Sequence, residues 1–328
     1  SALKTVTTAT ALEVLGPDFH FVTEFRAAAP MQNGLLEGDL VLVGGGDPML
    51  DLTTLEQIAA KLHATGLRRI TGGIRVDADL IKGSLYPDFW DWGDIGNGYG
   101  SGVSALNLNH NRYTARFRPG TAIGQPAAFL GTEPEVPDVT FRNEVTTGPA
   151  GSGDGVIIHG GENTPVIHLR GTLPLDAKGF TVTGAVPDPA AFATHHFQRL
   201  LVARGIQIDG RLTSSASPAK VVLLQHLSPP LIEIITSIHA TSDNHETECV
   251  LRLLGHQKQR DPVAVIRDHW KDRGLDFIRL RMEDGSTTNI GKVEPGGIIG
   301  FNMGIGLGLN EKMSLSLGYD QNSVEASK

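Results

Sequence analysis

"SALKTVTTATALEVLG", residues 1–16, predicts an Ala-rich helix at the start of the chain. Four apolar side chains recur near one face of this helix: Val6, Ala9, Leu12 and Leu15. Gly16-Pro17 is a typical helix end, so we expect the helix to stop there. Ser1 and Lys4 are three positions apart, and on a helix their side chains lie on the same face.

A serine and a lysine at this spacing can form a nucleophile and its base. A serine hydroxyl is a weak nucleophile unless a base lies within hydrogen-bond reach. Lysine can be that base when burial or a nearby cation lowers its pKa. Ser217 and Lys220 have the same spacing, but Pro218 between them disfavours a catalytic helix. Taken alone, the pattern at Ser1 also fits a solvated first helical turn.

The second motif is Ser242-Asp243-Asn244, which lies between two apolar helical patterns and is the one Ser-x-Asn of the sequence. A loop at such a junction can point a hydroxyl and an amide into a cleft. Ser, Asp and Asn are also common helix N-caps, so these residues could simply begin the next helix. Local sequence favours the cap.

Composition excludes several classes of protein. The chain has 328 residues, 20% of them charged, with a net charge of −8, which argues against nucleic-acid binding. Cys249 is the one cysteine, so neither a disulfide framework nor a cysteine-based metal site is expected. No apolar run approaches the roughly 18 residues of a membrane-spanning helix. We expect no cofactor and no metal.

Several further elements are expected between the two motifs. Residues 40–43 have the pattern of a buried strand, and Gly44-Gly45-Gly46 after it predicts a tight turn. No Lys-Ser/Thr follows these glycines, which a phosphate-binding loop would require. A helix ending at Gly66 is expected next, with Thr53 and Glu56 spaced as a capping box.

Residues 90–184 are Gly-rich with short strand-like runs, which predicts a β-rich region rather than a linker. Trp90 and Trp92 in it are expected to form a small satellite core. A helix over 189–203 follows. Another helix is expected to begin with Ser228 as its N-cap, and the helix after Asn244 is expected to end at Gly255.

Residues 301–319 alternate apolar with small or polar residues on both sides of Asn310-Glu311-Lys312, which predicts a β-hairpin. Such alternation is also typical of paired strands in outer-membrane proteins. An ending foreign to the rest of the chain and a pairing with the main sheet are therefore both open.

Four stretches together resemble one enzyme family: "SALKTVTTATALEVLGPDFHF", "GDLVLVGGGDPML", "LSPPLIEII" with "TSDNHETECVLRLLG", and "MEDGS". In this order they are similar to the D-alanyl-D-alanine carboxypeptidase/endopeptidase family, the class C low-molecular-mass penicillin-binding proteins. The likeness covers roughly residues 1–286. It implies an α/β fold, with a serine transpeptidase/β-lactamase-like domain interrupted by large β-rich insert domains. The implied boundaries are 1–25 and 221–290 for the transpeptidase-like domain, 26–220 for the inserts and 291–328 for the atypical hairpin segment.

The resemblance also implies roles for four residues. Ser1 is expected to be the acylated nucleophile and Lys4 its general base. Ser242 is expected to assist proton transfer, and Asn244 to contact Lys4 or the substrate. A structural role is expected for Glu248. The implied partners are peptidoglycan peptides, with β-lactams as inhibitors, and the implied location is the periplasm or cell envelope.

The sequence departs from the family pattern in two ways. The family's third motif, Lys-Thr-Gly, is absent from the 328 residues, and the likeness ends after Ser286, so the family sequence looks truncated here. The leading expectation is a serine D,D-carboxypeptidase/endopeptidase that acts through an acyl-enzyme. The alternative is a catalytically impaired scaffold or envelope-binding protein that keeps the fold.

Overall fold

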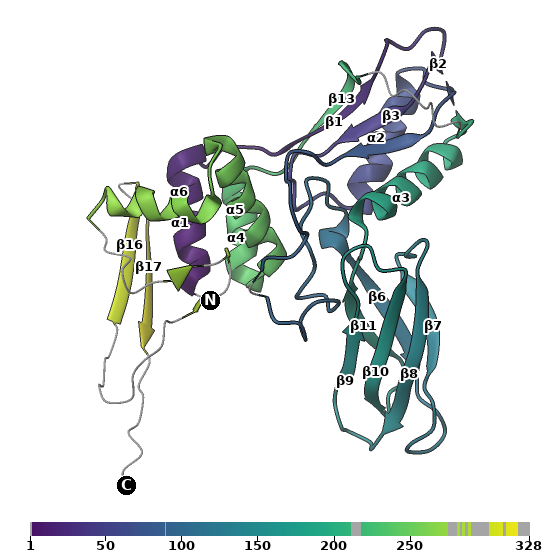
Figure 1. Cartoon of the computed structure of the whole chain (residues 1–328), viewed down its shortest axis with the longest axis vertical. Helices are drawn as coiled ribbons and strands as arrows, with labels where there is room; N and C mark the ends of the chain where they lie inside the picture. The colour runs from purple at the N-terminus through teal and green to yellow at the C-terminus, as the bar shows by residue number, and fades with distance from the viewer. Residues whose placement is uncertain are drawn as a thin grey trace.

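The computed structural model describes residues 2–88, 90–210, 218–274, 281–282, 284–285, 288–289, 302–310 and 313–320. Figure 1 shows three main groups of elements: a bundle of helices, a sheet with two helices beside it, and a lobe of strands. The chain leaves the helical bundle after its first helix and returns to it after β13 (Val221–Leu227). The architecture is therefore a mixed α/β fold with β-rich segments inserted into it.

The helical bundle joins the first helix to three helices from much later in the sequence. They are α1 (Ala2–Leu15), α4 (Leu231–Thr241), α5 (Asn244–Lys258) and α6 (Pro262–Lys271). Val6 and Ala9 of α1 are buried in one core with Ile238 of α4 and Leu254 of α5. Trp270 of α6 adds a polar contact, since its Nε1 donates to Thr10 Oγ1 at 2.8 Å. The predicted apolar face of residues 1–16 is confirmed, with Leu12 and Leu15 at the edge of this core.

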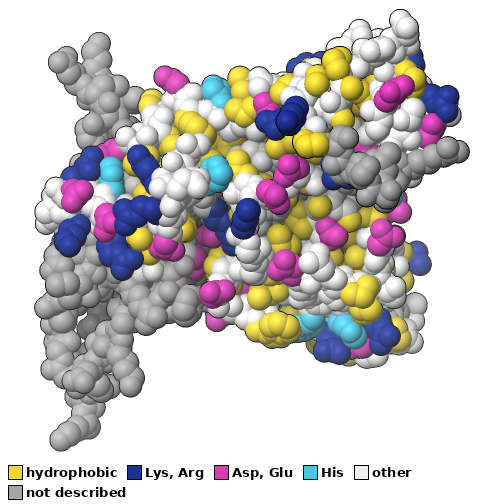
Figure 2. Space-filling model, turned by 45° about the horizontal axis from the view of Figure 1, so that its top comes forward, with side chains coloured by type: hydrophobic (Ala, Val, Ile, Leu, Met, Phe, Trp, Pro, Cys, Tyr) yellow, Lys and Arg dark blue, Asp and Glu magenta, His cyan; other side chains and the backbone are white. Residues whose placement is uncertain are grey.

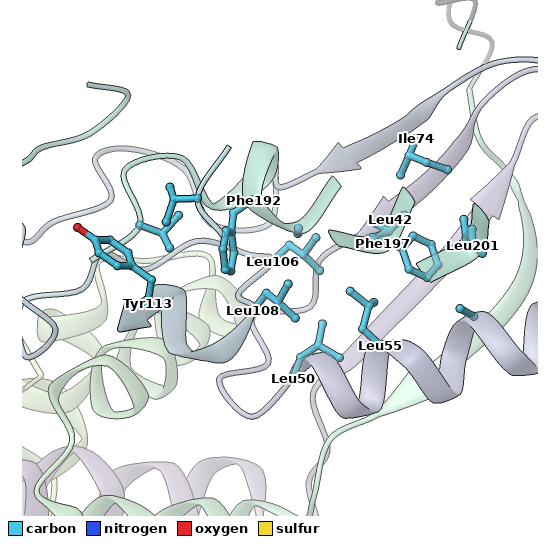
Figure 3. Packing of buried hydrophobic residues seen from close by; sticks show 14 of the residues in the cluster. Leu42, Leu50, Leu55, Ile74, Leu106, Leu108, Tyr113, Phe192, Phe197 and Leu201 are labelled. Atoms are coloured by element: carbon cyan, nitrogen blue, oxygen red, sulfur yellow. The ribbon is translucent and has the colours of Figure 1, made fainter. Parts of the chain in front are cut away.

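A four-stranded sheet has the order β13-β1-β3-β5, with β1 at Val22–Ala27, β3 at Leu40–Val43 and β5 at Ile74–Asp77. β1 is antiparallel to β13 and β3, whereas β3 and β5 are parallel. Two helices, α2 (Leu52–Ala64) and α3 (Pro189–Ala203), lie beside the sheet (Figure 1). Figure 3 shows Leu42 of the sheet, Leu55 of α2 and Phe197 of α3 meeting in the shared core. A small sheet, β12-β4-β2, flanks them with Gln207–Ile208, Arg69–Ile70 and Leu35–Leu36.

The lobe of strands contains two three-stranded sheets. One has the order β8-β10-β9, formed by Thr140–Gly148, Val166–Pro174 and Gly155–His159. The other has the order β11-β6-β7, formed by Phe180–Ala185, Arg112–Arg118 and Ala128–Glu133. Inward-facing side chains of both sheets belong to one core, where the ring of Phe129 lies 5.1 Å from that of Phe141. A single turn of 3-10 helix, η1 (Asn109–Asn111), leads into β6. The β-rich character predicted for residues 90–184 is confirmed.

The tight turn predicted at the three consecutive glycines is wrong: residues 44–46 continue from β3 without a turn or bend, and the N–H groups of Gly44 and Gly46 donate to the carbonyl oxygens of Asp77 and Ala105. A Cβ on Gly45 would lie 1.9 Å from the carbonyl oxygen of Val22, and a Cβ on Gly44 would lie 2.3 Å from that of Ala105. Gly46 has a φ of +83°, which favours glycine. The glycines therefore permit this stretch to lie closer to the segments at Val22 and Ala105 than side chains would allow.

Three predicted helix ends are wrong. The N-cap of α2 is Asp51, whose carboxylate accepts from Thr54 N, so Thr53 and Glu56 do not form a capping box there. Helix α4 begins after Pro230, and the Ser228 hydroxyl instead accepts from Phe21 N at 3.0 Å, beside the sheet.

Helix α5 continues past Gly255 to Lys258 and is capped by Gln259, which has a φ of 51°. A Cβ on Gly255 would lie 2.9 Å from both the carbonyl oxygen of Arg260 and Cβ of Pro262. This glycine therefore permits the chain after α5 to fold back closely, rather than ending the helix.

The predicted hairpin is confirmed in the described strands. β16 (Asn302–Asn310) and β17 (Met313–Asp320) are antiparallel and form a two-stranded sheet of their own. Another small sheet joins β14 (Arg281–Met282) to β15 (Thr288–Asn289). Within the described strands the hairpin does not extend the four-stranded sheet β13-β1-β3-β5, which decides against the alternative that it pairs with the main sheet. Across the helices that the structure describes, none has the length and apolarity needed to cross a membrane.

The expected domain boundaries stay a prediction. β1 spans the boundary expected between residues 25 and 26, and its partner β13 begins at the boundary expected between 220 and 221. The four-stranded sheet therefore crosses the first expected joint within β1, whereas β13 lies wholly after the second.

Surface charge follows no single sign. On the face drawn in Figure 2, Lys and Arg side chains lie among Asp and Glu side chains and do not form one extended basic patch.

Trp92 is 75% exposed, whereas Trp90 is buried with its ring 6.5 Å from that of Tyr86. The satellite core expected for both tryptophans therefore includes only Trp90.

Candidate active site

Lys4 and Ser242 come together although 238 residues separate them. Helix α1 carries Lys4, whose side chain is only 3% exposed, to the junction of α4 and α5. Its Nζ lies 3.2 Å from Ser242 Oγ and also donates to the main-chain carbonyl of Ser242. Ser1 lies outside the described residues. The structure thus brings together two of the four predicted site residues.

The junction between α4 and α5 determines how Ser242 is presented. Ser242 ends α4 in the left-handed conformation, with φ 57° and ψ 38°, which is uncommon for a residue other than glycine. Asp243 follows as the N-cap of α5, and its carboxylate accepts from Glu246 N at 3.0 Å. Both interpretations of this motif therefore apply, because Asp243 caps the helix while Ser242 turns toward Lys4.

The surroundings of Lys4 favour its neutral form. Burial lowers the pKa of its ammonium group from the usual 10.5. The negative charge of Asp243 opposes this shift, and the positive charge of Arg112 adds to it. A lysine that acts as a general base near neutral pH needs a lowered pKa, and burial shifts the pKa of Lys4 in that direction.

Arg112, which lies outside the helical bundle, forms an ion pair with Asp243 of the motif. It stands at the start of β6, and its Nη1 and Nη2 lie 2.7 and 3.2 Å from the two carboxylate oxygens of Asp243. Its Nε donates to Ser101 Oγ at 3.1 Å. Burial alone would raise the pKa of Asp243, but the hydrogen bond and charge of Arg112 lower it well below its usual value. Asp243 is therefore a carboxylate at neutral pH.

Asn244 lies at the opening of the site and not at its bottom. Its Nδ2 donates to the carbonyl oxygen of Tyr99 at 3.2 Å. The two roles expected for Asn244, a contact with Lys4 or with the substrate, both stay predictions. A hollow of about 250 Å³ opens beside Asn244. The hollow is lined by residues 241–244 of the motif loop and by four residues from the β-rich region: Gly98, Tyr99, Arg112 and Thr183.

Glu248 connects α5 to the segment at Gly285. Its buried carboxylate accepts from Arg252 Nε at 2.8 Å and from Gly285 N at 3.0 Å. On the other side, the hydroxyl of Thr7 in α1 donates to the carbonyl oxygen of Gly285 at 3.1 Å. The segment at Gly285 therefore links α1 to α5, which is the structural role expected for Glu248.

Sequence reasoning missed the contributions of the β-rich region. Arg112, Tyr99 and Thr183 follow no motif, and they lie at least 59 positions from Ser242 in the sequence. Only the packing of the β-rich region against α5 places them at the hollow. No local pattern could have identified them.

A protein-family model matches most of the chain. The model of the D-Ala-D-Ala carboxypeptidase 3 (S13) family matches residues 1–288. The chain belongs to this family. The family resemblance seen in the sequence is thereby confirmed, and the match ends close to the point where the resemblance does.

The chain is also similar to two curated proteins that are named D-alanyl-D-alanine carboxypeptidases. A D-alanyl-D-alanine carboxypeptidase of Actinomadura sp. is 32% identical over 312 residues, with 89% of this chain and 57% of the relative covered. The D-alanyl-D-alanine carboxypeptidase DacB of Haemophilus influenzae is 26% identical over 299 residues, with 87% and 61% covered. This S13-family chain thus spans about three fifths of the length of the curated relatives it matches.

The fold is shared with a solved structure. The crystal structure of penicillin binding protein 4 from Haemophilus influenzae superposes with a TM-score of 0.74 at 23% identity, covering 87% of this chain and 64% of that one. The same protein complexed with a β-lactam superposes with a TM-score of 0.68 at 23% identity, covering 87% and 63%. The expected fold class, transpeptidase-like with β-rich inserts, is confirmed for this S13-family chain.

The contact between Asp243 and Arg112 leads to a prediction about stability and pH. Replacing Asp243 by asparagine is expected to destabilise the protein by about 1.5–3 kcal/mol at neutral pH, because Arg112 loses a charged acceptor while asparagine still caps α5. The pKa of Asp243 is lowered on folding, so its contribution is complete above the unfolded value of about 3.9 and is lost as the pH falls toward the folded value.

Urea unfolding of the protein and of Asp243→Asn at stepwise lower pH measures this difference. The gap between the two should narrow as the pH drops below about 4. A gap that is the same at pH 7 and pH 3 would contradict an ionised Asp243 as its source.

Proposed function

We propose that this protein is a serine D,D-carboxypeptidase/endopeptidase that hydrolyses D-Ala-containing peptide stems of peptidoglycan through an acyl-enzyme. The observation that supports it best is the meeting of Lys4 and Ser242 at 3.2 Å, with the pKa of Lys4 lowered by burial. Two short motifs far apart in sequence thereby form one site. Membership of the S13 family and the names of the curated relatives point to the same chemistry.

In this proposal Ser1 Oγ attacks the carbonyl carbon of the D-Ala-D-Ala amide bond, and Lys4 Nζ accepts its proton. Backbone N–H groups stabilise the oxyanion that forms. The C–N bond then breaks, and the proton passes from Lys4 through the Ser242 hydroxyl to the leaving amine. Water attacks the acyl-Ser1 ester in the second half of the reaction and releases the free enzyme. Asn244, at the mouth of the hollow, contacts the bound peptide.

Substrate and location belong to the same proposal. A peptide ending in D-Ala-D-Ala occurs in the bacterial cell wall, so the protein would act in the periplasm or in association with the cell envelope. A β-lactam mimics that peptide end, and the structural neighbour from Haemophilus influenzae has been solved with one bound. β-Lactams are therefore the natural probes of Ser1.

Acylation by a β-lactam tests the proposal. The purified 328-residue chain is incubated with penicillin and its mass is measured, and a single added penicilloyl group is expected. The addition should disappear in Ser1→Ala. It should persist in Ser217→Ala, which alters the other Ser-x-x-Lys in the sequence.

The same experiment separates the enzyme from the alternative, a scaffold or envelope-binding protein that keeps the fold. A protein shown to be folded by circular dichroism that gains no mass at high penicillin concentration would favour the scaffold. An adduct that survives in Ser1→Ala would overturn the assignment of the nucleophile.

A further inference from the structure

An unusual backbone turn lies directly before Arg112. Asn109, His110 and Asn111 all have a positive φ, at 51°, 55° and 52°. Each such residue is individually uncommon outside glycine, and a run of them persists only where the surroundings hold it. This left-handed turn is thus a feature that needs a physical explanation.

Side-chain hydrogen bonds hold the turn from two directions. Asn109 Oδ1 accepts from Leu52 N, at the first residue of α2, at 3.0 Å. The amide of Asn111 donates to Gly102 O at 2.9 Å and to Asn107 Oδ1 at 2.8 Å. The turn is therefore fixed to the sheet side of the molecule.

His110 of the turn and Arg112 directly after it both contact the first turn of α5. His110 Nε2 lies 2.8 Å from Glu246 Oε1, and the Glu246 oxygen also accepts from Ser237 Oγ at 3.1 Å. Arg112 holds both carboxylate oxygens of Asp243. The segment 109–112 thus connects the start of α2 to Asp243, the residue that follows Ser242.

We propose that Arg112 is a positioning residue, which holds Asp243 with both arms of its guanidinium group and so keeps Ser242 in the left-handed conformation that presents its hydroxyl to Lys4. This role rests on the proposed function, in which Lys4 and Ser242 transfer the proton. A planar guanidinium matches both oxygens of a carboxylate, whereas the ammonium of a lysine acts as a single charge.

Arg112 would act on Lys4 by charge as well as by geometry. The charged groups that influence Lys4 are Asp243, Glu246 and Asp284, which favour its protonated form, and Arg112, which favours its neutral form. His239 of α4 also faces this region, where its pKa is lowered by burial and by the charge of Lys4. Removing Arg112 deletes a positive charge and leaves Asp243 uncompensated, so both changes favour protonated Lys4.

Two substitutions separate these effects. In Arg112→Gln we expect penicillin acylation to slow by about tenfold or more at pH 7, with the pH dependence of the rate displaced to higher pH. In Arg112→Lys the charge stays, so the pH dependence should stay near that of the original protein, while the rate still falls because only one oxygen is held. Arg69→Gln is the control, since Arg69 also contacts both oxygens of an aspartate, Asp209, far from the site, and its replacement should change neither quantity.

A second measurement does not depend on acylation. The protein labelled with ¹³C at lysine Cε is titrated by NMR, and the Lys4 signal is assigned by its loss in Lys4→Arg. The midpoint of Lys4 should move to higher pH in Arg112→Gln and to lower pH in Asp243→Asn. If Arg112→Gln does not fold, Arg112→Lys still tests the geometric part by its rate.

The outcomes distinguish the two proposals. A protein that is acylated by penicillin equally fast, and with the same pH dependence, with and without Arg112 would overturn the positioning role while leaving the proposed function intact. A protein that is not acylated at all contradicts the proposed function. In that case an unchanged Lys4 midpoint in Arg112→Gln would overturn the role of Arg112 separately.

Discussion

Replacing Lys4 by methionine is expected to slow acylation by penicillin by about 10²- to 10⁴-fold, the usual loss when a general base is removed. Methionine fills a similar volume and suits the buried position of Lys4, which is 3% exposed. The fold should therefore survive while Ser1 loses its proton acceptor. Stopped-flow or quenched mass measurement of the acylation rate checks the expectation.

Lys61→Met provides the matched control for Lys4→Met. Lys61 lies on the exposed side of α2, away from α4 and α5, so its replacement should leave the acylation rate unchanged. If Lys4→Met were acylated as fast as the original protein, Lys4 could not be the base. The 3.2 Å contact with Ser242 would then be structural.

Replacing Phe197 by alanine is expected to cost about 3–5 kcal/mol in the free energy of unfolding, because a large buried ring is lost and a cavity is left. Phe197 on α3 is fully buried, and its ring centroid lies 5.2 Å from that of Phe25 in β1. Figure 3 shows the ring within the core beside the sheet. Urea unfolding followed by circular dichroism measures the loss.

Val202→Ala on the same helix is the control for Phe197→Ala. Val202 is 54% exposed, so its replacement should change the free energy of unfolding by no more than about 0.5 kcal/mol. A loss in Phe197→Ala no larger than that in Val202→Ala would contradict packing of α3 against the sheet as the source of the stability, because alanine itself has the highest helix propensity.

Local sequence predicted the elements whose determinants lie within a few neighbours. The apolar faces of α1, α2 and α4 repeat at helical spacing, and the apolar run at 40–43 forms the expected strand. Helix ends were less predictable. Ser228 looks like an N-cap in sequence, but a tertiary contact with Phe21 N uses its hydroxyl.

The site shows the same division. Ser-x-x-Lys and Ser-x-Asn each have an ordinary explanation as a helix start or a cap, and only their order along a family-like chain singled them out. Arg112 and Tyr99 were invisible because neither residue follows a local pattern. Their roles arise from distances across the fold: Arg112 reaches Asp243 over 131 positions, and Asn244 reaches Tyr99 over 145.

The sequence alone therefore predicted five of the six α-helices that the structure describes, the hairpin, the β-rich character of the insert and the family to which the chain belongs, but not α6. Periodicity, turn residues and motif order depend only on the order of residues along the chain, so they can be identified from the sequence. Only the tertiary structure decided that Lys4 is buried against Ser242 and that Arg112 pairs with Asp243. Burial and charge pairing depend on which surfaces pack together, and those surfaces come from segments more than a hundred residues apart.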